Sequence, residues 1–163
     1  MASTKEKVLA LAHQYFEDTV SNRRHLHQNP ELSFEEYNTS AFVKSQMDQL
    51  GIPYETKADT GIVALITGDL SSNEVIALRA DMDALPIQEV EGRSYGSKNP
   101  GVMHACGHDV HTSSLLGTAK ILHSLKAEFG GTIKLIFQPG EERLPGGASL
   151  MIKEGALQHP APS

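Results

Sequence analysis

Residues 112–137 read TSSLLGTAKILHSLKAEFGGTIKLIF, and this stretch decides the fold class. Its first part, residues 112–129, repeats apolar side chains at the spacing of one helix face, which predicts a helix. Gly130 and Gly131 end that helix, and residues 132–137 (TIKLIF) form a short apolar run typical of a strand. A helix followed at once by an apolar strand indicates an α/β fold, with helices packed on a sheet.

Two further apolar runs precede this unit. Residues 61–67 (GIVALIT) and 74–78 (EVIAL) are rich in β-branched side chains and predict a pair of strands joined by the turn-rich residues 68–73. Residues 81–110 show no sustained period, which is typical of a long functional loop. Since helices and strands alternate along the chain, at least part of the sheet is expected to be parallel.

The N-terminal third predicts two helices. Residues 3–6 (STKE) have the form of a capping box and open one continuous helix that ends before Pro30. Residues 33–36 (SFEE) have the same form and open a second helix, which ends at Gly51. A short helix is also expected over residues 147–154.

Composition excludes several classes of protein. The 163 residues carry a net charge of −6, which argues against a nucleic-acid binder because such proteins need a basic face. No apolar stretch approaches the roughly 18 residues needed to cross a bilayer. The single cysteine cannot form an internal disulfide, so we expect a reducing, cytoplasmic setting.

Two pairs of carboxylates directly follow predicted strands. Asp81 and Asp83 follow the strand over residues 74–78, and Glu141 and Glu142 follow the strand over residues 132–137. Because ligands of open α/β sheets bind beyond the carboxyl ends of the strands, the two pairs indicate one shared acidic site. The plainer interpretation is that such loops are often acidic because carboxylates suit helix N-termini.

Residues 104–111 (HACGHDVH) add the donors that metals prefer. Three histidines, the only cysteine and an aspartate lie within these eight residues. A lone histidine is usually structural, but thiolate and imidazole together are the ligands of zinc and related cations, and carboxylates complete such sites. We therefore predict a metal site built from this loop and the carboxylates.

The spacing of residues 104–111 indicates which of their side chains face the same side. In an extended loop Cys106 and His108 face the same side, and His104 shares that side, so its role stays open. Asp109 and His111 point elsewhere and are expected to orient imidazoles through hydrogen bonds. Adjacent carboxylates cannot easily bind one cation together, so the glutamate pair is expected to divide the work between a ligand and a base.

Four motifs resemble one known family. They are residues 23–36 (RRHLHQNPELSFEE), 79–87 (RADMDALPI), 104–112 (HACGHDVHT) and 138–142 (QPGEE). Together they resemble the metal-dependent amidohydrolases that include hippurate hydrolase, bacterial aminoacylases and plant auxin-conjugate hydrolases, within the aminoacylase and carboxypeptidase metallopeptidase group. The motifs occur in the same order and span nearly the whole chain.

The resemblance implies a phosphorylase/hydrolase-like, three-layer α/β/α catalytic domain with two divalent cations. By motif, Cys106, His108 and Glu142 correspond to metal ligands, and Glu141 to the general base. Asp81 and Asp83 correspond to neighbours that support the site. The family's signature histidines match His25 and His27, for which we expect hydrogen bonding at a buried helix end.

Family members are more than twice as long, with an inserted lid or dimerisation domain and two further histidine ligands. The resemblance therefore implies that residues 1–163 are the N-terminal part of the catalytic domain, truncated and without the lid. Such a fragment would hold at most one cation and be inactive alone. The full-length form could be a homo-oligomer.

The expected reaction is hydrolysis of the amide bond of N-acyl amino acids, such as hippurate or N-acetyl amino acids. The substrate is a small molecule, with neither nucleic acid nor membrane as partner. The cation stays open between zinc, manganese, cobalt and nickel. A rival enzyme hypothesis makes Cys106 a nucleophile with His108 or His104 as its base, but leaves both carboxylate pairs unused.

Overall fold

The computed structural model describes residues 2–163 and places four strands in one sheet of order β1-β2-β4-β3. The strands are β1 (Tyr54–Lys57), β2 (Gly61–Thr67), β3 (Leu70–Asp81) and β4 (Gly130–Gln138). β2 pairs antiparallel with both β1 and β4, whereas β3 lies parallel to β4. The sheet is mixed, and the predicted parallel part is confirmed.

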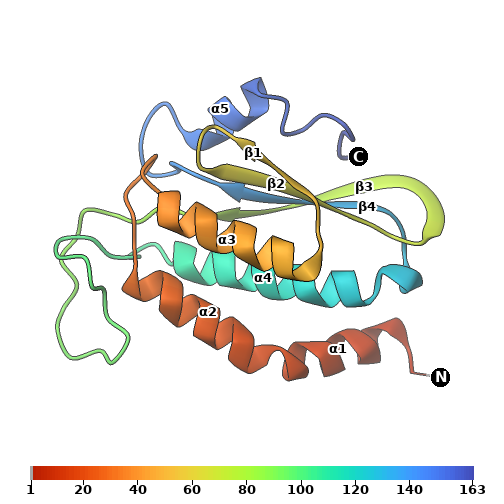
Figure 1. Ribbon diagram of the computed structural model, residues 1–163, viewed down its shortest axis with the longest axis horizontal. Helices are drawn as coiled ribbons and strands as arrows, with labels where there is room; N and C mark the ends of the chain where they lie inside the picture. The colour runs from red at the N-terminus through yellow and green to blue at the C-terminus, as the bar shows by residue number, and fades with distance from the viewer. Residues whose placement is uncertain (1) are drawn as a thin grey trace.

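Helices cover both faces of the sheet. They are α1 (Thr4–Gln14), α2 (Phe16–Gln28), α3 (Tyr37–Leu50), α4 (His108–Ser124) and α5 (Gly147–Lys153). Figure 1 shows α5 above the sheet and α3 and α4 below it, with α1 and α2 farther out along α4. The predicted three-layer α/β/α class is confirmed. None of the helices in residues 2–163 is long and apolar enough to cross a bilayer.

The alternation of side chains along β2 and β4 builds a core on each face. Ile62 of β2 and Phe137 of β4 are fully buried with residues of α3 and α4 in the larger cluster. Val63 and Ile136, one position along, join Met151 of α5 in the smaller cluster. Because neighbouring strand residues point to opposite faces, both strands must be apolar on both sides.

The N-terminal helix is not continuous. The predicted capping box is confirmed, since the side chain of Ser3 accepts from the amide of Glu6 and the side chain of Glu6 accepts from the amide of Ser3. The chain then breaks at Tyr15, whose backbone has φ −96° and ψ 6°. At this break the ring of Tyr15 lies 4.5 Å from the amine of Lys120 on α4. The break thus coincides with a contact between Tyr15 and α4. The spacing of apolar residues in the sequence does not predict such a contact.

The second predicted capping box is wrong. The carboxylate of Glu31 instead accepts from the amides of Asn38 and Thr39, 3.0 and 2.7 Å away, in the first turn of α3. Ser33 and Glu36 turn inward and bind other loops. A carboxylate near a helix N-terminus is favourable from any direction, so a residue outside the motif serves equally well.

Two other boundaries differ from prediction. α4 begins at His108 rather than residue 112, directly after Gly107, whose φ of 83° suits glycine. β2 and β3 do not pair with each other, because β4 lies between them. Residues 70–73, predicted as a turn, belong to β3, where the pairing with β4 shifts register between Leu70 and Val75.

Candidate metal centre

The carboxyl ends of β3 and β4 meet at one edge of the sheet, and α4 begins at the same edge. Asp81 is the last residue of β3, and the loop after β4 carries Glu141 and Glu142. His108 is the first residue of α4. Parallel pairing of Asp81 with Gln138 places the two strand ends side by side. The shared site predicted from the sequence thus has a structural basis in the parallel strand pair.

Asp83 holds three segments of this edge together. Its Oδ2 accepts from Ser33 Oγ at 2.6 Å and from the amide of Glu142 at 2.9 Å. His108 Nδ1 lies 2.9 Å from the carbonyl oxygen of Asp83 and 3.2 Å from its Oδ1. Burial alone would raise the pKa of Asp83, but the hydrogen bonds from His108 and Ser33 outweigh it and hold the pKa at about 2.

His108 is oriented by this contact. Since Nδ1 faces a carbonyl oxygen, it carries the proton, and Nε2 is left to face the glutamates. His108 Nε2 lies 3.9 Å from Glu142 Oε1 and 4.0 Å from Glu141 Oε2. Burial would lower the pKa of His108, but its hydrogen bonds with Asp83 prevail and raise it to about 8.

The metal-free chain should therefore be most stable between about pH 4 and about pH 6.5. The depressed pKa of Asp83 stabilises the fold above its unfolded pKa, and this stability is lost as the pH falls through about 2. The raised pKa of His108 stabilises the fold below its unfolded pKa, and this stability is lost as the pH rises through about 8. Both shifts describe one contact, worth about 2 kcal/mol.

The measurement is thermal unfolding of the wild type and of Asp83→Asn across this pH range in a chelating buffer. The stability difference between the two proteins should shrink as the pH falls from 4 towards 2, because Asp83 becomes protonated in the wild type. A difference that stays constant down to pH 2 would contradict the assigned contact.

Cys106 approaches the same edge from a different backbone geometry than expected. Gly107 is left-handed, so residues 106–108 are not extended. The Cys106 side chain is exposed, and the nearby Glu142 carboxylate, with burial, raises the pKa of the thiol to about 11. The alternating geometry assumed for the loop is therefore wrong at Gly107.

His104 does not join the donors. Both its ring nitrogens are buried and have no hydrogen-bond partner among the described residues. Burial lowers the pKa of His104 to about 4, so the ring is neutral. The role that the sequence left open for His104 is thus not a contact with the carboxylates of the site.

Asp109 pairs with an imidazole outside the 104–111 loop. Its Oδ2 lies 2.7 Å from His27 Nδ1 and 2.8 Å from Arg23 Nε, and it forms no bond with His108. His27 Nε2 in turn lies 2.9 Å from Glu89 Oε1. This buried network fastens the end of α2 to the first turn of α4 and to the 89–97 loop, whose Ser97 amide donates to Glu89.

The two signature histidines therefore differ. His27 is buried at the end of α2 and hydrogen-bonded, as predicted. His25 is exposed and its ring lies 4.4 Å from that of Phe42, so its predicted burial is wrong. The sequence analysis did not predict that Arg23 and Glu89 belong to this network. Arg23 lies within the motif over residues 23–36, which could have pointed to it, but no pattern in the sequence points to Glu89.

His111 and Asp81 lie on the other side of His108. His111 Nδ1 is 3.3 Å from Asp81 Oδ2, and its ring stacks on the ring of His108 with centroids 5.5 Å apart. Arg79 pairs with the other oxygen of Asp81 and also donates to Gln138 at 2.6 Å. Asp81 and His111 thus lie close to His108, and their supporting role stays a prediction.

Glu36, which the sequence assigned to a helix cap, supports the glutamate loop instead. Its buried carboxylate accepts from the amides of Gly140 and Phe34, at 2.8 and 2.9 Å, and from Thr60 Oγ1 at 2.7 Å. Burial raises the pKa of Glu36. The bond to Gly140 fixes the backbone just before Glu141 and Glu142.

Glu36→Ala should lower the free energy of unfolding by about 3 kcal/mol, because three donors, two of them buried, lose their acceptor. Glu36→Gln, which keeps one carbonyl oxygen, should lose less. Urea unfolding of the three proteins measures both effects. Equal stability of Glu36→Ala and the wild type would show that Glu36 does not hold the loop.

Donor atoms that fit a cation converge at this edge in two groups. One group is His108, Glu141 and Glu142; the other is Asp81, His108 and His111. Within each group one donor atom from every residue lies within 4.8 Å of the others. Imidazole and carboxylate donors at such spacing suit zinc-like cations, so the residues present fit a metal. Cys106, predicted as a ligand, belongs to neither group, although Glu142 lies near enough to raise the pKa of its thiol.

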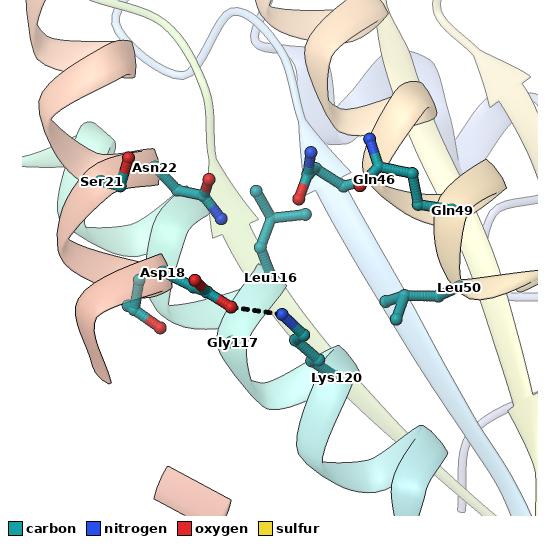
Figure 2. A pocket seen from close by; sticks show the side chains of 10 residues that line it. Asp18, Ser21, Asn22, Gln46, Gln49, Leu50, Leu116, Gly117 and Lys120 are labelled. Carbon is teal, nitrogen blue, oxygen red and sulfur yellow. Dashed lines mark hydrogen bonds and ion pairs between the residues drawn. The ribbon is translucent and has the colours of Figure 1, made fainter. Parts of the chain in front are cut away.

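A pocket lies elsewhere on the molecule and differs in chemistry from the sheet edge. It is a pocket of about 240 Å³ between α2, α3 and α4, lined by polar side chains that include Asn22, Gln46 and Gln49. Figure 2 shows its Asp18–Lys120 ion pair, which neutralises the charged groups within it. None of the grouped metal donors lines this pocket, so the sheet edge is the stronger candidate.

Known proteins resemble this chain in sequence. The sequence pattern of peptidase family M20/M25/M40 matches residues 77–163. The chain is 46% identical over 155 residues to the N-acyl-L-amino acid amidohydrolase of Geobacillus stearothermophilus, covering 94% of this chain and 42% of that protein. It is 46% identical over 153 residues to the IAA-amino acid hydrolase ILR1-like 5 of Arabidopsis thaliana, covering 93% and 34%.

Solved structures agree with these relatives. The YXEP protein of Bacillus subtilis, described as a dinuclear metal binding peptidase from the M20 family, superposes with a TM-score of 0.84 at 41% identity. That match covers 89% of this chain and 41% of the other. A putative aminohydrolase from methicillin-resistant Staphylococcus aureus has a TM-score of 0.89 at 40% identity, covering 93% and 39%.

Fold and donor set together define an α/β protein with a candidate metal centre at the carboxyl edge of its sheet. Within that class, the chain belongs to peptidase family M20/M25/M40. It spans between one third and about two fifths of the length of the curated relatives compared above, 34% and 42%.

Proposed function

We propose that this protein hydrolyses the amide bond of N-acyl amino acids with the help of a divalent cation. The observation that carries the proposal is the convergence of His108 with Glu141 and Glu142, with Cys106 against Glu142. Relatives named as an N-acyl-L-amino acid amidohydrolase and an IAA-amino acid hydrolase support the reaction type. Both names describe an acyl group joined to an amino acid.

In this proposal Cys106, His108 and Glu142 hold the cation. His108 is oriented through Nδ1 by Asp83, and the amide of Glu142 donates to the same aspartate. Such contacts fix ligands in place and usually affect metal affinity by about 10–100-fold. Zinc, manganese, cobalt and nickel are all compatible with this mixture of sulfur, nitrogen and oxygen donors.

A bound divalent cation supplies two things here: it lowers the pKa of water and polarises the amide carbonyl. Glu141 takes the proton from the attacking water and returns it to the leaving amine. Glu141 suits this task because its side chain is 43% exposed, compared with 20% for Glu142, and has no hydrogen bond to Cys106. The more exposed carboxylate is the one free to move a proton.

The rival nucleophile hypothesis finds little support in the geometry. The thiol of Cys106 has a raised pKa and lies near a carboxylate, which disfavours the thiolate that a nucleophile needs. None of the hydrogen bonds among residues 2–163 links Cys106 to His104 or His108. Metal ligation explains the position of Cys106 better than nucleophilic attack.

The test is hydrolysis of hippurate and of N-acetyl amino acids, measured with bound metal before and after chelation. Chelation should abolish hydrolysis, and added cation should restore it. Hydrolysis that survives chelation but is lost to a thiol reagent would support the nucleophile instead. Cation uptake without any hydrolysis would support the alternative of a chain that binds one metal but lacks turnover.

A further inference from the structure

Phe34 has a left-handed backbone, with a φ of 67°. Bulky side chains rarely occupy this region, because their Cβ atom lies too close to the backbone. Such residues persist only where the surrounding structure holds them, and they gather at functional sites. Phe34 lies between α2 and α3, and it is neither a helix cap nor one of the grouped metal donors.

The carboxylate of Glu36 joins Phe34 to the glutamate loop, residues 139–146, which follows β4. Its Oε1 accepts from the amide of Phe34 at 2.9 Å and from the amide of Gly140 at 2.8 Å. One oxygen thus holds the backbone of Phe34 close to the backbone of Gly140. Glu36 is fully buried, so water does not compete for these bonds.

The ring of Phe34 lies directly on Gly140. A Cβ atom at position 140 would be 2.3 Å from Cε1 of Phe34 and 2.4 Å from its Cζ. The ring therefore occupies the space in which a side chain at this position would begin. Because the ring contacts the backbone, it blocks movement of the glutamate loop in that direction.

Ser33, the residue before Phe34, reaches the metal donors through Asp83. Ser33 Oγ donates to Asp83 Oδ2 at 2.6 Å, and that oxygen also accepts from the amide of Glu142 at 2.9 Å. The same aspartate orients His108. Residues 33–36 are therefore linked to both halves of the candidate metal centre, the glutamates and His108.

We propose that Phe34 is a positioning residue, whose ring fixes the backbone of the glutamate loop and so directs Glu141 and Glu142 towards His108. Without the ring the loop gains room to move, and the two carboxylates spread over a wider range of positions. The inference rests on the proposed function, because Phe34 acts only through the two glutamates that this function uses.

The experiment measures two properties of Phe34→Ala and of the wild-type chain. The first is hydrogen exchange of the Gly140 and Glu142 amides in the metal-free protein, followed by NMR, and the second is the affinity for Co²⁺. Phe34→Ala should speed the exchange of both amides by at least about tenfold, because the loop opens more often. It should weaken cobalt binding by about 10–100-fold, the usual cost of losing a residue that orients ligands. Phe34→Leu fills part of the same space and should lose less.

Phe34→Gly separates positioning of the loop from stability of the fold. Glycine accepts a φ of 67° without strain, so this variant should melt at a higher temperature than Phe34→Ala, although neither has a ring. If the ring positions the loop, Phe34→Gly exchanges no more slowly and binds cobalt no more tightly than Phe34→Ala. Recovery of Phe34→Gly towards the wild type would overturn the proposal, and so would wild-type values for Phe34→Ala.

The control is Asp59→Gly, because Asp59 has nearly the same backbone conformation, with a φ of 68°, between β1 and β2. Its side chain is exposed and belongs to neither donor group. Asp59→Gly should leave amide exchange and cobalt affinity unchanged, and losses equal to those of Phe34→Ala would count against the proposal. A wild type that binds no cobalt would contradict the proposed function, whereas the exchange comparison, made without metal, would still decide the role of Phe34.

Discussion

Glu141→Gln is expected to reduce the turnover of an N-acyl amino acid by about 10²–10⁴-fold, the usual contribution of a general base. Glutamine keeps the size of the side chain but cannot take a proton. Because Glu141 has no hydrogen bond to Cys106, the variant should keep its cation content and its melting temperature. The measurements are kcat and bound metal on the same protein sample.

Glu17→Gln is the matched control, since Glu17 is an exposed carboxylate on α2 away from the donor groups. It should leave both kcat and metal content unchanged. If Glu141→Gln loses its cation together with its activity, the residue is a ligand and not the base. If turnover stays within a few-fold of the wild type, another group moves the proton.

Cys106→Ala and Glu142→Gln are expected to lower the affinity for a divalent cation by more than about 100-fold. Removing a direct ligand should exceed the roughly 10–100-fold cost of removing a residue that only orients one. Equilibrium dialysis with metal analysis measures the affinity of each variant beside the wild type.

Comparison with Glu141→Gln decides the division of roles within the glutamate pair. We expect a large loss of affinity for Glu142→Gln and little for Glu141→Gln. An equal loss in Cys106→Ala, Glu142→Gln and Glu141→Gln would contradict that division. No loss in Cys106→Ala would exclude the sulfur as a ligand and leave only nitrogen and oxygen donors.

Much of the fold was predictable from local patterns. The strand over Gly61–Thr67 has the predicted bounds, and the helix before β4 follows from its apolar stripe. β1 (Tyr54–Lys57) was missed because its four residues alternate too briefly to show a period. The start of α4 was missed because three of the residues 108–111 are polar and the segment carries no apolar stripe, although His108 and Asp109 are buried.

The strand order could not be predicted from the same patterns. β2 and β3 are adjacent in sequence and looked like a pair, but β4 inserts between them. Both neighbours of β4 pair with it along most of its length, one parallel and one antiparallel. A strand that is apolar on both sides can occupy the centre of a sheet, and its partners depend on the whole packing.

Sequence alone determined the alternation of elements, the placement of acidic residues at strand ends and the gathering of histidines and a cysteine before α4. These features lie within single segments, where spacing fixes which side chains share a face. Only the tertiary structure showed that Asp83 joins Ser33, His108 and Glu142, and that Glu36 holds Gly140 across 104 residues of chain. Such bonds exist because the parallel pairing of β3 and β4 brings distant loops to one edge, and no local period encodes that pairing.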